Sequence, residues 1–575
     1  MKAKRIYILL AIIAILFLLL LFRLSQIQLF STESFGQSNV NLLERSVAQR
    51  SHQIVLSNGR GTIVDRNGIE LTNKKVNDAI IFPGFQSNTD LVNRIAEVLA
   101  VSTNQIRSKT NEVENPLYLT DILDVEISEA QFEDLKEISV QGFLPVERSI
   151  SEDPSVASHF VGLVRENKQA YEKRYEAKGD QIKPVGISGI EQAFDPFLLA
   201  KEEEKLLYHV DAVGQPMFGY ELLYSGFENS FYPLTVETTI DVSLQKKAEE
   251  LLAKYKIKDG GIVLLDVESR DVLVMASRPL INSDNPYEQD SIANRMLISN
   301  PPGSVFKTVV ALAAIEQLHV DPNRTFNCSK DYLNDNEKAN RDLGMLNFEQ
   351  SFAKSCNRTF AELAVELMEK DPDLLNQYVD RLGLLGPVGW TGNRYQYENL
   401  RHFPQEQKGS IWGFEGAEKD AGVVKVTAIG QRDVRLTPLA VANMMATIAS
   451  NGENKSVRGV KRIVYKNGST MTEFEEQKKE QTLNPYSLNQ LKKLMIQVTS
   501  ENGTASSLQG LDIAGKSGTA QMGDSKKTHH WFGGFFPYEK PKYAMVGVEF
   551  NNTEESSKIY SVYKELVEFI YETNK

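Results

Sequence analysis

Cysteine and clustered basic residues are scarce in this sequence. Its 575 residues include only two cysteines, Cys328 and Cys356, which are too few for a disulfide framework and belong to no spacing typical of a metal site. One disulfide between them stays open, as does a pair of buried free thiols. The formal net charge of -12 at pH 7 argues against a nucleic-acid partner, because a phosphate backbone requires a basic face. We predict no metal and no cofactor.

The sequence also lacks internal repeats, and what it contains is ordinary globular material. Hydrophobic residues make up 41% and charged residues 24%, so the chain can bury a large interior. At 575 residues it exceeds the size of one ordinary core, which favours two to four domains.

A long uncharged apolar stretch lies near the N-terminus. It runs from Ile6 to Phe22, about 17 residues, which is at the short end of the length that spans a bilayer as a helix. No small-x-small cleavage pattern follows it, so we favour an uncleaved anchor over a cleaved signal peptide. Lys2, Lys4 and Arg5 place the N-terminus in the cytoplasm by the positive-inside rule, so we expect all that follows the anchor to be extracytoplasmic.

Residues 31–232 mix helical and strand-like patterns. The Asn67–Gly68 pair between β-branched runs is typical of a hairpin, and apolar residues recur at helical spacing from Asn88 to Ile138. We expect an elongated, mixed α/β pedestal domain here, after a cytoplasmic stub and anchor over residues 1–30.

Residues 233–575 have the pattern of an α+β domain. A strand, a helix with Asp241 as its N-cap and a hairpin over residues 260–277 begin it, and the chain is then helix-rich from Ser304 to about Gly452. Three strands and a helix end the chain, at 513–519, 530–536, 543–550 and 556–573. Because strands from both ends flank a helical block, we expect a sheet assembled from distant segments.

The segment PPGSVFK places a serine and a lysine at the start of an apolar helix. Ser304 and Lys307 are three residues apart and so share one helix face. Apolar neighbours should desolvate the Lys307 ammonium and lower its pKa, which makes a neutral amine available to activate the Ser304 hydroxyl. The alternative is a helix cap followed by a snorkelling lysine on an ordinary helix, and SxxK alone does not exclude it.

Two further motifs support the catalytic interpretation. The segment AKSCNRTF supplies Ser355 and Asn357, and IAGKSGTAQ supplies residues 516–519. On a strand, Lys516 and Gly518 face one way and Ser517 and Thr519 the other, and the glycine lets a substrate backbone approach closely.

SxxK, SxN and K[TS]G in this order resemble the set of the penicillin-binding protein and serine β-lactamase superfamily. Other segments resemble monofunctional, class B penicillin-binding proteins: RGTIVDRNG at 60–68, GISGIE at 186–191, TTID with a following LQ at 238–245, NR at 294–295, GQRDVRLTPLAVANMMATIASNG at 430–452 and GTA at 503–505. The short distance between anchor and Arg60 leaves no room for the glycosyltransferase domain of class A proteins, and a soluble β-lactamase would lack anchor and pedestal.

This resemblance implies a transpeptidase domain over residues 233–575, with an antiparallel sheet flanked by helices, that cross-links peptidoglycan stem peptides. By resemblance, Ser304 is the nucleophile that attacks the penultimate D-alanine carbonyl, and Lys307 is its base. Ser355 relays the proton to the leaving amine, and Asn357 holds Lys307 and the substrate amide.

The third motif implies substrate contacts. Lys516 holds the terminal carboxylate, with the hydroxyls of Ser517 and Thr519 as further ligands and Gly518 leaving room for the substrate. The main-chain N–H groups of Ser304 and Thr519 form the oxyanion hole. Ser517 replaces the commoner threonine and keeps its hydroxyl, and Cys356, in the middle of SxN, is expected to point into the core.

The implied partners are stem peptides ending in D-alanyl-D-alanine, β-lactams and a polytopic glycosyltransferase of the wall-synthesis machinery. Two other functions stay open: a D,D-carboxypeptidase or endopeptidase that gives the same acyl-enzyme to water, and a β-lactam receptor or scaffold without turnover. The motifs do not distinguish roles in elongation, division or sporulation.

Overall fold

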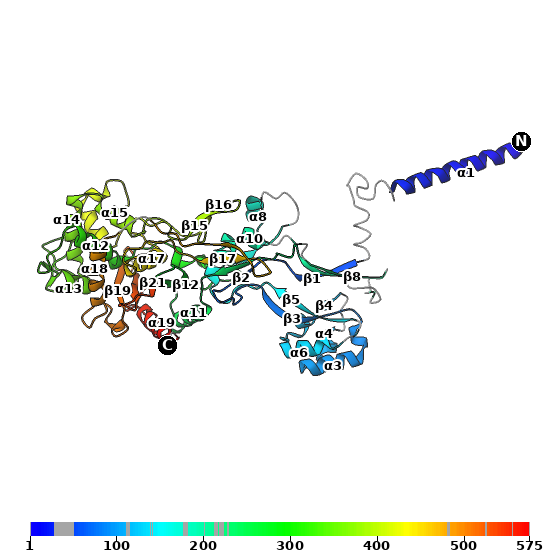
Figure 1. Cartoon of the computed structure of the whole chain (residues 1–575), viewed down its shortest axis with the longest axis horizontal. Coiled ribbons are helices and arrows are strands. Elements are labelled where there is room, and N and C mark those ends of the chain that lie inside the picture. Colours follow the sequence, from blue (N-terminus) through cyan, green and yellow to red (C-terminus); the bar gives the residue numbers. More distant parts are fainter. Residues whose placement is uncertain are drawn as a thin grey trace. The chain divides into compact units, whose positions relative to one another are not determined.

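A computed structural model describes residues 2–27, 51–110, 115–138, 140, 142–175, 182–199, 202–211, 217, 223–226, 229–479, 483–523, 526–554 and 556–573 (Figure 1). The chain forms two compact units that interleave along the sequence. The first unit comprises Met1–Gly59, Lys74–Ser151 and Ala200–Ser230, and the second comprises Arg60–Asn73, Glu152–Leu199 and Phe231–Lys575.

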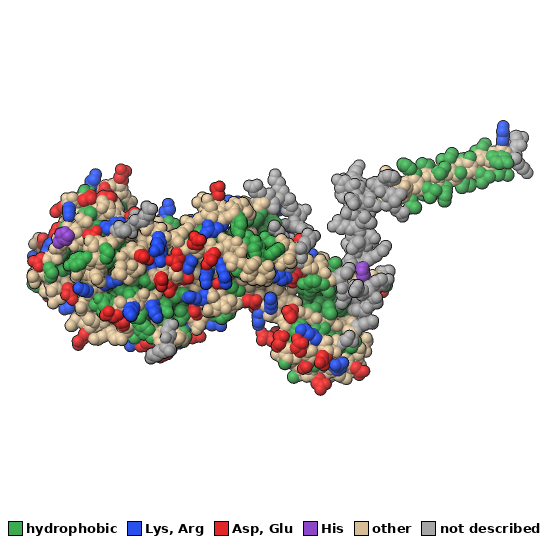
Figure 2. Space-filling view, in the orientation of Figure 1, with side chains coloured by type: hydrophobic (Ala, Val, Ile, Leu, Met, Phe, Trp, Pro, Cys, Tyr) green, Lys and Arg blue, Asp and Glu red, His purple; other side chains and the backbone are tan. Residues whose placement is uncertain are grey.

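The N-terminal helix α1 (Lys2–Ser25) carries exposed apolar side chains along its whole length, and Figure 2 shows them in green on the visible side of the helix. Its 22 residues from Lys4 to Ser25 are 0% buried, and at 1.5 Å per residue they extend about 33 Å. A hydrocarbon core is about 30 Å thick. The helix therefore fits a single-pass membrane anchor.

The rest of the first unit contains two three-stranded sheets. One has the order β1 (Ser51–Ser57), β8 (Glu204–His209) and β9 (Leu223–Ser225); the other has the order β4 (Leu117–Tyr118), β3 (Lys74–Ile81) and β5 (Phe143–Ile150). The second sheet packs with α3 (Thr89–Leu99), α4 (Thr103–Thr110), α5 (Leu119–Leu123) and α6 (Glu129–Lys136). Ile95, Phe132 and Leu135 lie at the centre of this small core, since each is at most 1% exposed.

Two segments that we expected in the pedestal, 60–73 and 152–199, belong to the second unit. The strand β2 (Thr62–Val64) pairs in parallel with β10 (Thr235–Thr238). On the other side of β10 the same sheet continues with β17 (Val460–Val464) and then β18 (Thr470–Glu473). Arg60 is buried in ion pairs with Glu191 and Asp195 (2.7 Å to the latter). No single cut between residues 232 and 233 separates the units, because these contacts join segments far apart in sequence.

The main sheet of the second unit is antiparallel and five-stranded, with the order β12 (Val272–Arg278), β11 (Gly260–Asp266), β21 (Tyr543–Asn552), β20 (Thr528–Phe536) and β19 (Ala514–Gln521). The helices α11 (Val242–Lys254) and α19 (Ile559–Thr573) pack together and α19 covers one face, whereas α17 (Pro438–Ala449) covers the other (Figure 1). The prediction of a sheet built from distant segments is confirmed, and β19 is one of its two edge strands.

A helical block completes this unit. Its helices are α12 (Lys307–Gln317), α13 (Phe348–Ala353), α14 (Asn357–Lys370), α15 (Leu374–Arg381), α16 (Ala421–Ala428) and α18 (Pro485–Gln497). Residues 309–314 of α12 are 0% exposed, and burial on every side explains why this part of the helix has no polar face. The shorter elements of the unit are α7 (Ser158–Val161), β6 (Val164–Arg165), α8 (Lys168–Tyr175), β7 (Val185–Gly186), α9 (Gly189–Ala193), α10 (Asp195–Leu198), β13 (Thr325–Asn327), β14 (Met345–Asn347), β15 (Thr391–Arg394) and β16 (Tyr397–Arg401).

Candidate active site

Ser304 lies on a tight turn at the entry to α12. The turn is a single 3₁₀ helix, Gly303–Phe306, that runs directly into α12 at Lys307. Gly303 has φ of 55°, and a Cβ there would lie 2.4 Å from the carbonyl oxygen of Thr519. Only glycine therefore lets this turn pack against β19. The serine is half-buried, so its side chain is accessible.

Lys307 is completely buried and holds the SxN segment. Its Nζ donates to the Ser355 carbonyl (2.9 Å), to Ser355 Oγ (3.1 Å) and to Asn357 Oδ1 (2.7 Å). Burial, reinforced by the charges of Lys516 and Arg341, holds the pKa of Lys307 well below its ordinary value. The structure shows no hydrogen bond between Lys307 and Ser304, both of which lie in the described range, and the amine faces Ser355 instead.

Ser355 occupies the tight turn between α13 and α14. Its φ of 56° lies in the left-handed region, which is costly for a residue with a Cβ. The surrounding structure holds it there: Lys307 and Lys516 donate to its hydroxyl, the latter over 3.1 Å, and Arg341 Nη2 donates to its carbonyl over 3.2 Å. Ser355 is thus the point at which two buried amines meet.

Asn357 is the first residue of α14. Its Oδ1 accepts from Lys307, while the residue is exposed and its amide nitrogen has no partner among the described residues. That nitrogen is therefore available to a ligand carbonyl.

The two cysteines form a disulfide, with an S–S distance of 2.07 Å and Cα atoms 5.9 Å apart. The bond joins Cys356, the middle residue of SxN, to Cys328, the residue directly after β13. Both cysteines are 2% exposed, so Cys356 points into the core as expected. The SxN segment is therefore held covalently as well as by hydrogen bonds.

The third motif lies on the edge strand β19. Lys516 is buried, and its Nζ donates to Ser355 Oγ (3.1 Å) and to the Ser517 carbonyl (3.0 Å). Burial, and then the charge of Arg341, lowers the pKa of Lys516 to about 7. The Ser517 hydroxyl contacts the Thr504 hydroxyl at 2.5 Å and accepts from Lys516 Nζ at 3.5 Å.

The main chain of β19 lies against the Ser304 turn. A Cβ on Gly518 would meet the Pro302 carbonyl at 2.3 Å, and a Cβ on Gly303 would meet Thr519 N at 3.0 Å. The Thr519 carbonyl oxygen accepts from Gln431 (3.4 Å) and lies next to Gly303 of the Ser304 turn. Because N–H and C=O of one strand residue point the same way, the Thr519 N–H also faces the turn. Thr519 is exposed, as a ligand contact requires.

Arg341 and Thr504 are two site residues that the sequence did not assign. Thr504 belongs to the GTA segment, which was noted without a role, and its main-chain N donates to the Ala353 carbonyl (3.1 Å). Arg341 lies on the loop between β13 and β14, where no motif marks it. Only its contact with the SxN turn reveals it.

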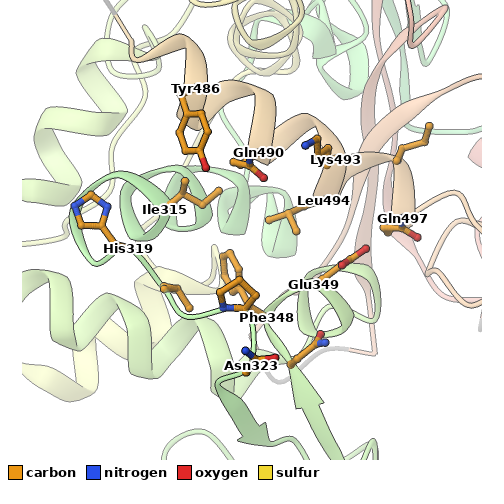
Figure 3. A pocket seen from close by; sticks show the side chains of 14 residues that line it. Ile315, His319, Asn323, Phe348, Glu349, Tyr486, Gln490, Lys493, Leu494 and Gln497 are labelled. Atoms are coloured by element: carbon orange, nitrogen blue, oxygen red, sulfur yellow. The ribbon is translucent and has the colours of Figure 1, made fainter.

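A separate cavity of about 700 Å³ lies at the other end of the helical block (Figure 3). Ile315 and His319 from the end of α12, Phe348 from α13 and Tyr486 from α18 line it. None of the motif residues belongs to its lining, so it is distinct from the cluster of motif residues around Ser355.

Comparison with known proteins identifies this arrangement. The family model described as "Penicillin binding protein transpeptidase domain" matches residues 260–568, and "Penicillin-binding Protein dimerisation domain" matches residues 56–220. The first model covers more than half of the chain. The chain therefore belongs to the penicillin-binding protein transpeptidase family, a family of serine acyltransferases.

Curated relatives agree with this assignment. Peptidoglycan D,D-transpeptidase PbpA of Mycobacterium tuberculosis is 27% identical over 356 residues, which is 56% of this chain and 68% of the relative. Stage V sporulation protein D of Bacillus subtilis is 25% identical over 573 residues, or 94% of this chain and 80% of the relative. A solved structure described as "Structural coordination of polymerization and crosslinking by a peptidoglycan synthase complex" covers 99% of both chains with a TM-score of 0.64 at 23% identity.

Proposed function

We propose that this protein is a peptidoglycan D,D-transpeptidase that β-lactams inhibit. The substrate is a stem peptide ending in D-alanyl-D-alanine. Ser304 Oγ attacks the carbonyl carbon of the penultimate residue, the terminal D-alanine leaves, and an amine of a neighbouring stem peptide takes the acyl group.

The observation that carries this proposal is the pair of buried amines at Ser355. Lys307 and Lys516 both donate to its hydroxyl over 3.1 Å, and no carboxylate among the described residues pairs with either amine. Two ammonium groups this close cannot both stay charged in a dry site, so one of them is a neutral amine at physiological pH. A neutral amine one helical turn from a serine supplies the base that acylation requires.

The proton path follows from these contacts. Lys307 takes the Ser304 proton as the hydroxyl attacks, and the Ser355 hydroxyl passes a proton to the departing amine. The two N–H groups of Ser304 and Thr519 stabilise the oxyanion. Lys307 then returns a proton to the Ser355 oxygen through their hydrogen bond, which leaves Lys307 neutral again. When the incoming neutral amine attacks the acyl-enzyme, Lys307 takes its proton and passes it to Ser304 Oγ as the ester bond breaks, so the free enzyme is regenerated.

The remaining groups hold the acyl donor. The terminal carboxylate pairs with Lys516, whose pKa of about 7 rises when the carboxylate binds. Thr519 supplies a hydroxyl to the same carboxylate, and Ser517, joined to Thr504, orders the strand beneath it. The Asn357 amide nitrogen donates to the carbonyl of the acyl side.

We propose that α1 anchors the chain with its N-terminus in the cytoplasm and its catalytic unit outside. The basic residues Lys4 and Arg5 at the start of α1 favour this orientation. The buried Cys328–Cys356 disulfide supports it, because structural disulfides form and persist in oxidising, extracytoplasmic compartments.

We also propose a membrane partner. The solved structure of similar fold is described as coordinating polymerisation and cross-linking. A polytopic glycosyltransferase that polymerises glycan strands is the partner that fits this description, contacted through the anchor and the pedestal of residues 31–232.

The test combines covalent labelling with turnover. The full chain in detergent is incubated with a fluorescent penicillin, which should label wild type and not Ser304→Ala. Incubation with lipid-linked, polymerised peptidoglycan should then yield cross-linked dimers. Labelling without dimers indicates a receptor, trimmed monomers indicate a carboxypeptidase, and an unlabelled wild type overturns the proposal.

A further inference from the structure

We propose that Arg341 is an anion-binding residue for the acyl side of the substrate, and that the preferred acyl donor carries a free carboxylate on the residue before D-alanyl-D-alanine. This inference rests on the proposed function. It concerns a second negative charge, distinct from the terminal carboxylate assigned to Lys516.

The guanidinium of Arg341 is held by hydrogen bonds from one of its nitrogens, and its other nitrogens can still donate. A single nitrogen, Nη2, donates to the Lys354 carbonyl (3.1 Å) and to the Ser355 carbonyl (3.2 Å). The other nitrogens, Nε and Nη1, make no hydrogen bond to any described residue, and the side chain is exposed. A guanidinium held at one end is pre-organised to receive a carboxylate at the other.

The position of Arg341 selects the acyl side. It contacts the same carbonyl oxygen that Lys307 uses, and that carbonyl lies two residues before Asn357, whose amide is proposed to hold the acyl side of the donor. The contacts of Arg341 are to the SxN turn and not to β19, where the terminal carboxylate is proposed to bind. A second carboxylate would therefore enter from the acyl side.

The neighbourhood leaves the charge of Arg341 uncompensated. Nearby Arg358 forms ion pairs with Asp335 (2.6 Å) and Glu362 (2.7 Å). In contrast, no acidic residue in the described ranges pairs with Arg341, and the adjacent Asp342 accepts from Ser329 instead. Of these two arginines, Arg341 contacts Ser355 and has no counterion among the described residues, and an anionic substrate would supply one.

Three penicillins provide a test, because they share one scaffold and differ in one charge. Benzylpenicillin is neutral at the side-chain α carbon, carbenicillin carries a carboxylate there and ampicillin carries an ammonium. All three retain the ring carboxylate. Second-order acylation rate constants are measured for the full-length wild type, Arg341→Gln, Arg341→Lys and Lys338→Gln, the last removing an exposed cation from the same loop.

We expect Arg341→Gln to lower the carbenicillin-to-benzylpenicillin rate ratio by about 3- to 5-fold and to raise the ampicillin-to-benzylpenicillin ratio. Arg341→Lys should keep most of both ratios, and Lys338→Gln should keep them fully. Ratios cancel any effect of Arg341 on the folding of the turn or on the pKa of Lys307, because these act on all three compounds alike.

The outcomes separate the two proposals. Ratios that are the same in wild type and Arg341→Gln overturn the anion site while the transpeptidase stands. Equal changes in Arg341→Gln and Lys338→Gln also overturn it, since they indicate an effect of the summed positive charge of the loop and not a specific ion pair with Arg341. A wild type that none of the three compounds acylates overturns the proposed function, and the anion site with it.

Discussion

Two buried clusters of positive charge in the catalytic unit are built on opposite principles. Arg60 is compensated by Glu191 and Asp195, and these carboxylates raise its pKa although burial opposes them. Lys307 and Lys516 are equally buried but share only a serine hydroxyl, and burial lowers the pKa of both. A buried cation that is paired with carboxylates joins segments of the fold. A buried amine without a carboxylate partner is either neutral or free to pair with a substrate anion.

The largest effect is expected on removing the uncompensated amine. Lys307→Met keeps the apolar stem and deletes the proposed base, so acylation by a penicillin should fall roughly 1,000-fold. Thermal unfolding should change little, because the lost hydrogen bonds to Ser355 and Asn357 are offset by removal of a buried amine, and no buried carboxylate loses a partner. Stopped-flow labelling and thermal denaturation measure the two quantities, and acylation within tenfold of wild type would contradict the assignment.

Removing Arg60 should have the opposite effect: a loss of stability with little change in acylation. Arg60→Met leaves Glu191 buried without its cation and leaves Asp195 with Arg174 as its remaining arginine, which should lower the free energy of unfolding by about 3–5 kcal/mol. Denaturant titration of the full chain in detergent measures this loss. Well below the unfolding transition, residual penicillin acylation per folded molecule should stay near wild type. A stability loss under about 1 kcal/mol would show that this cluster does not join the fold.

The cluster of Lys307, Lys516 and Ser355 is stabilised by a neighbouring disulfide and not by ion pairs among the described residues. Cys328 and Cys356 are 28 residues apart, so Cys328→Ala with Cys356→Ala should lower the free energy of unfolding by about 3–4 kcal/mol in the chain-entropy account. Denaturant titration of wild type with and without reductant should show the same loss. The double variant is the control. If reductant lowers its free energy of unfolding by a similar amount, the loss does not come from this disulfide.

The smallest effect is expected at the Thr504–Ser517 contact. Thr504→Val removes one hydroxyl from a pair 2.5 Å apart, which should slow acylation about fivefold, in keeping with about 1 kcal/mol for one hydrogen bond. Thr504→Ser restores the hydroxyl and should restore the rate. If the serine variant is as slow as the valine variant, the contact acts through packing.

The sequence predicted the candidate site more fully than the division into units. Short motifs predicted roles for Ser304, Lys307, Ser355, Asn357 and Lys516, because groups that act on one substrate keep a fixed spacing on a helix or strand. The structure brings four of these five together at Ser355 through hydrogen bonds.

Contacts between segments far apart in sequence were harder to foresee. Arg60 and Glu191 are 131 residues apart, so their pairing could not assign residues 60–73 and 152–199 to the catalytic unit. Arg341 is one arginine in a loop without periodicity. Cys328 and Cys356 could have been free or joined, because spacing alone does not fix the distance between two thiols.

The pH dependence of acylation tests most directly whether Lys307 is a neutral base. An amine is a base above its pKa, so a lowered pKa extends acylation toward lower pH. The rate constant for benzylpenicillin, measured from about pH 5 to pH 10 with Ser304→Ala as the blank, should decline in acid as Lys307 takes up a proton. It should also decline above about pH 7, as Lys516 loses the charge that holds the carboxylate. A rate constant that keeps rising toward the ordinary lysine value of 10.5 would contradict this account.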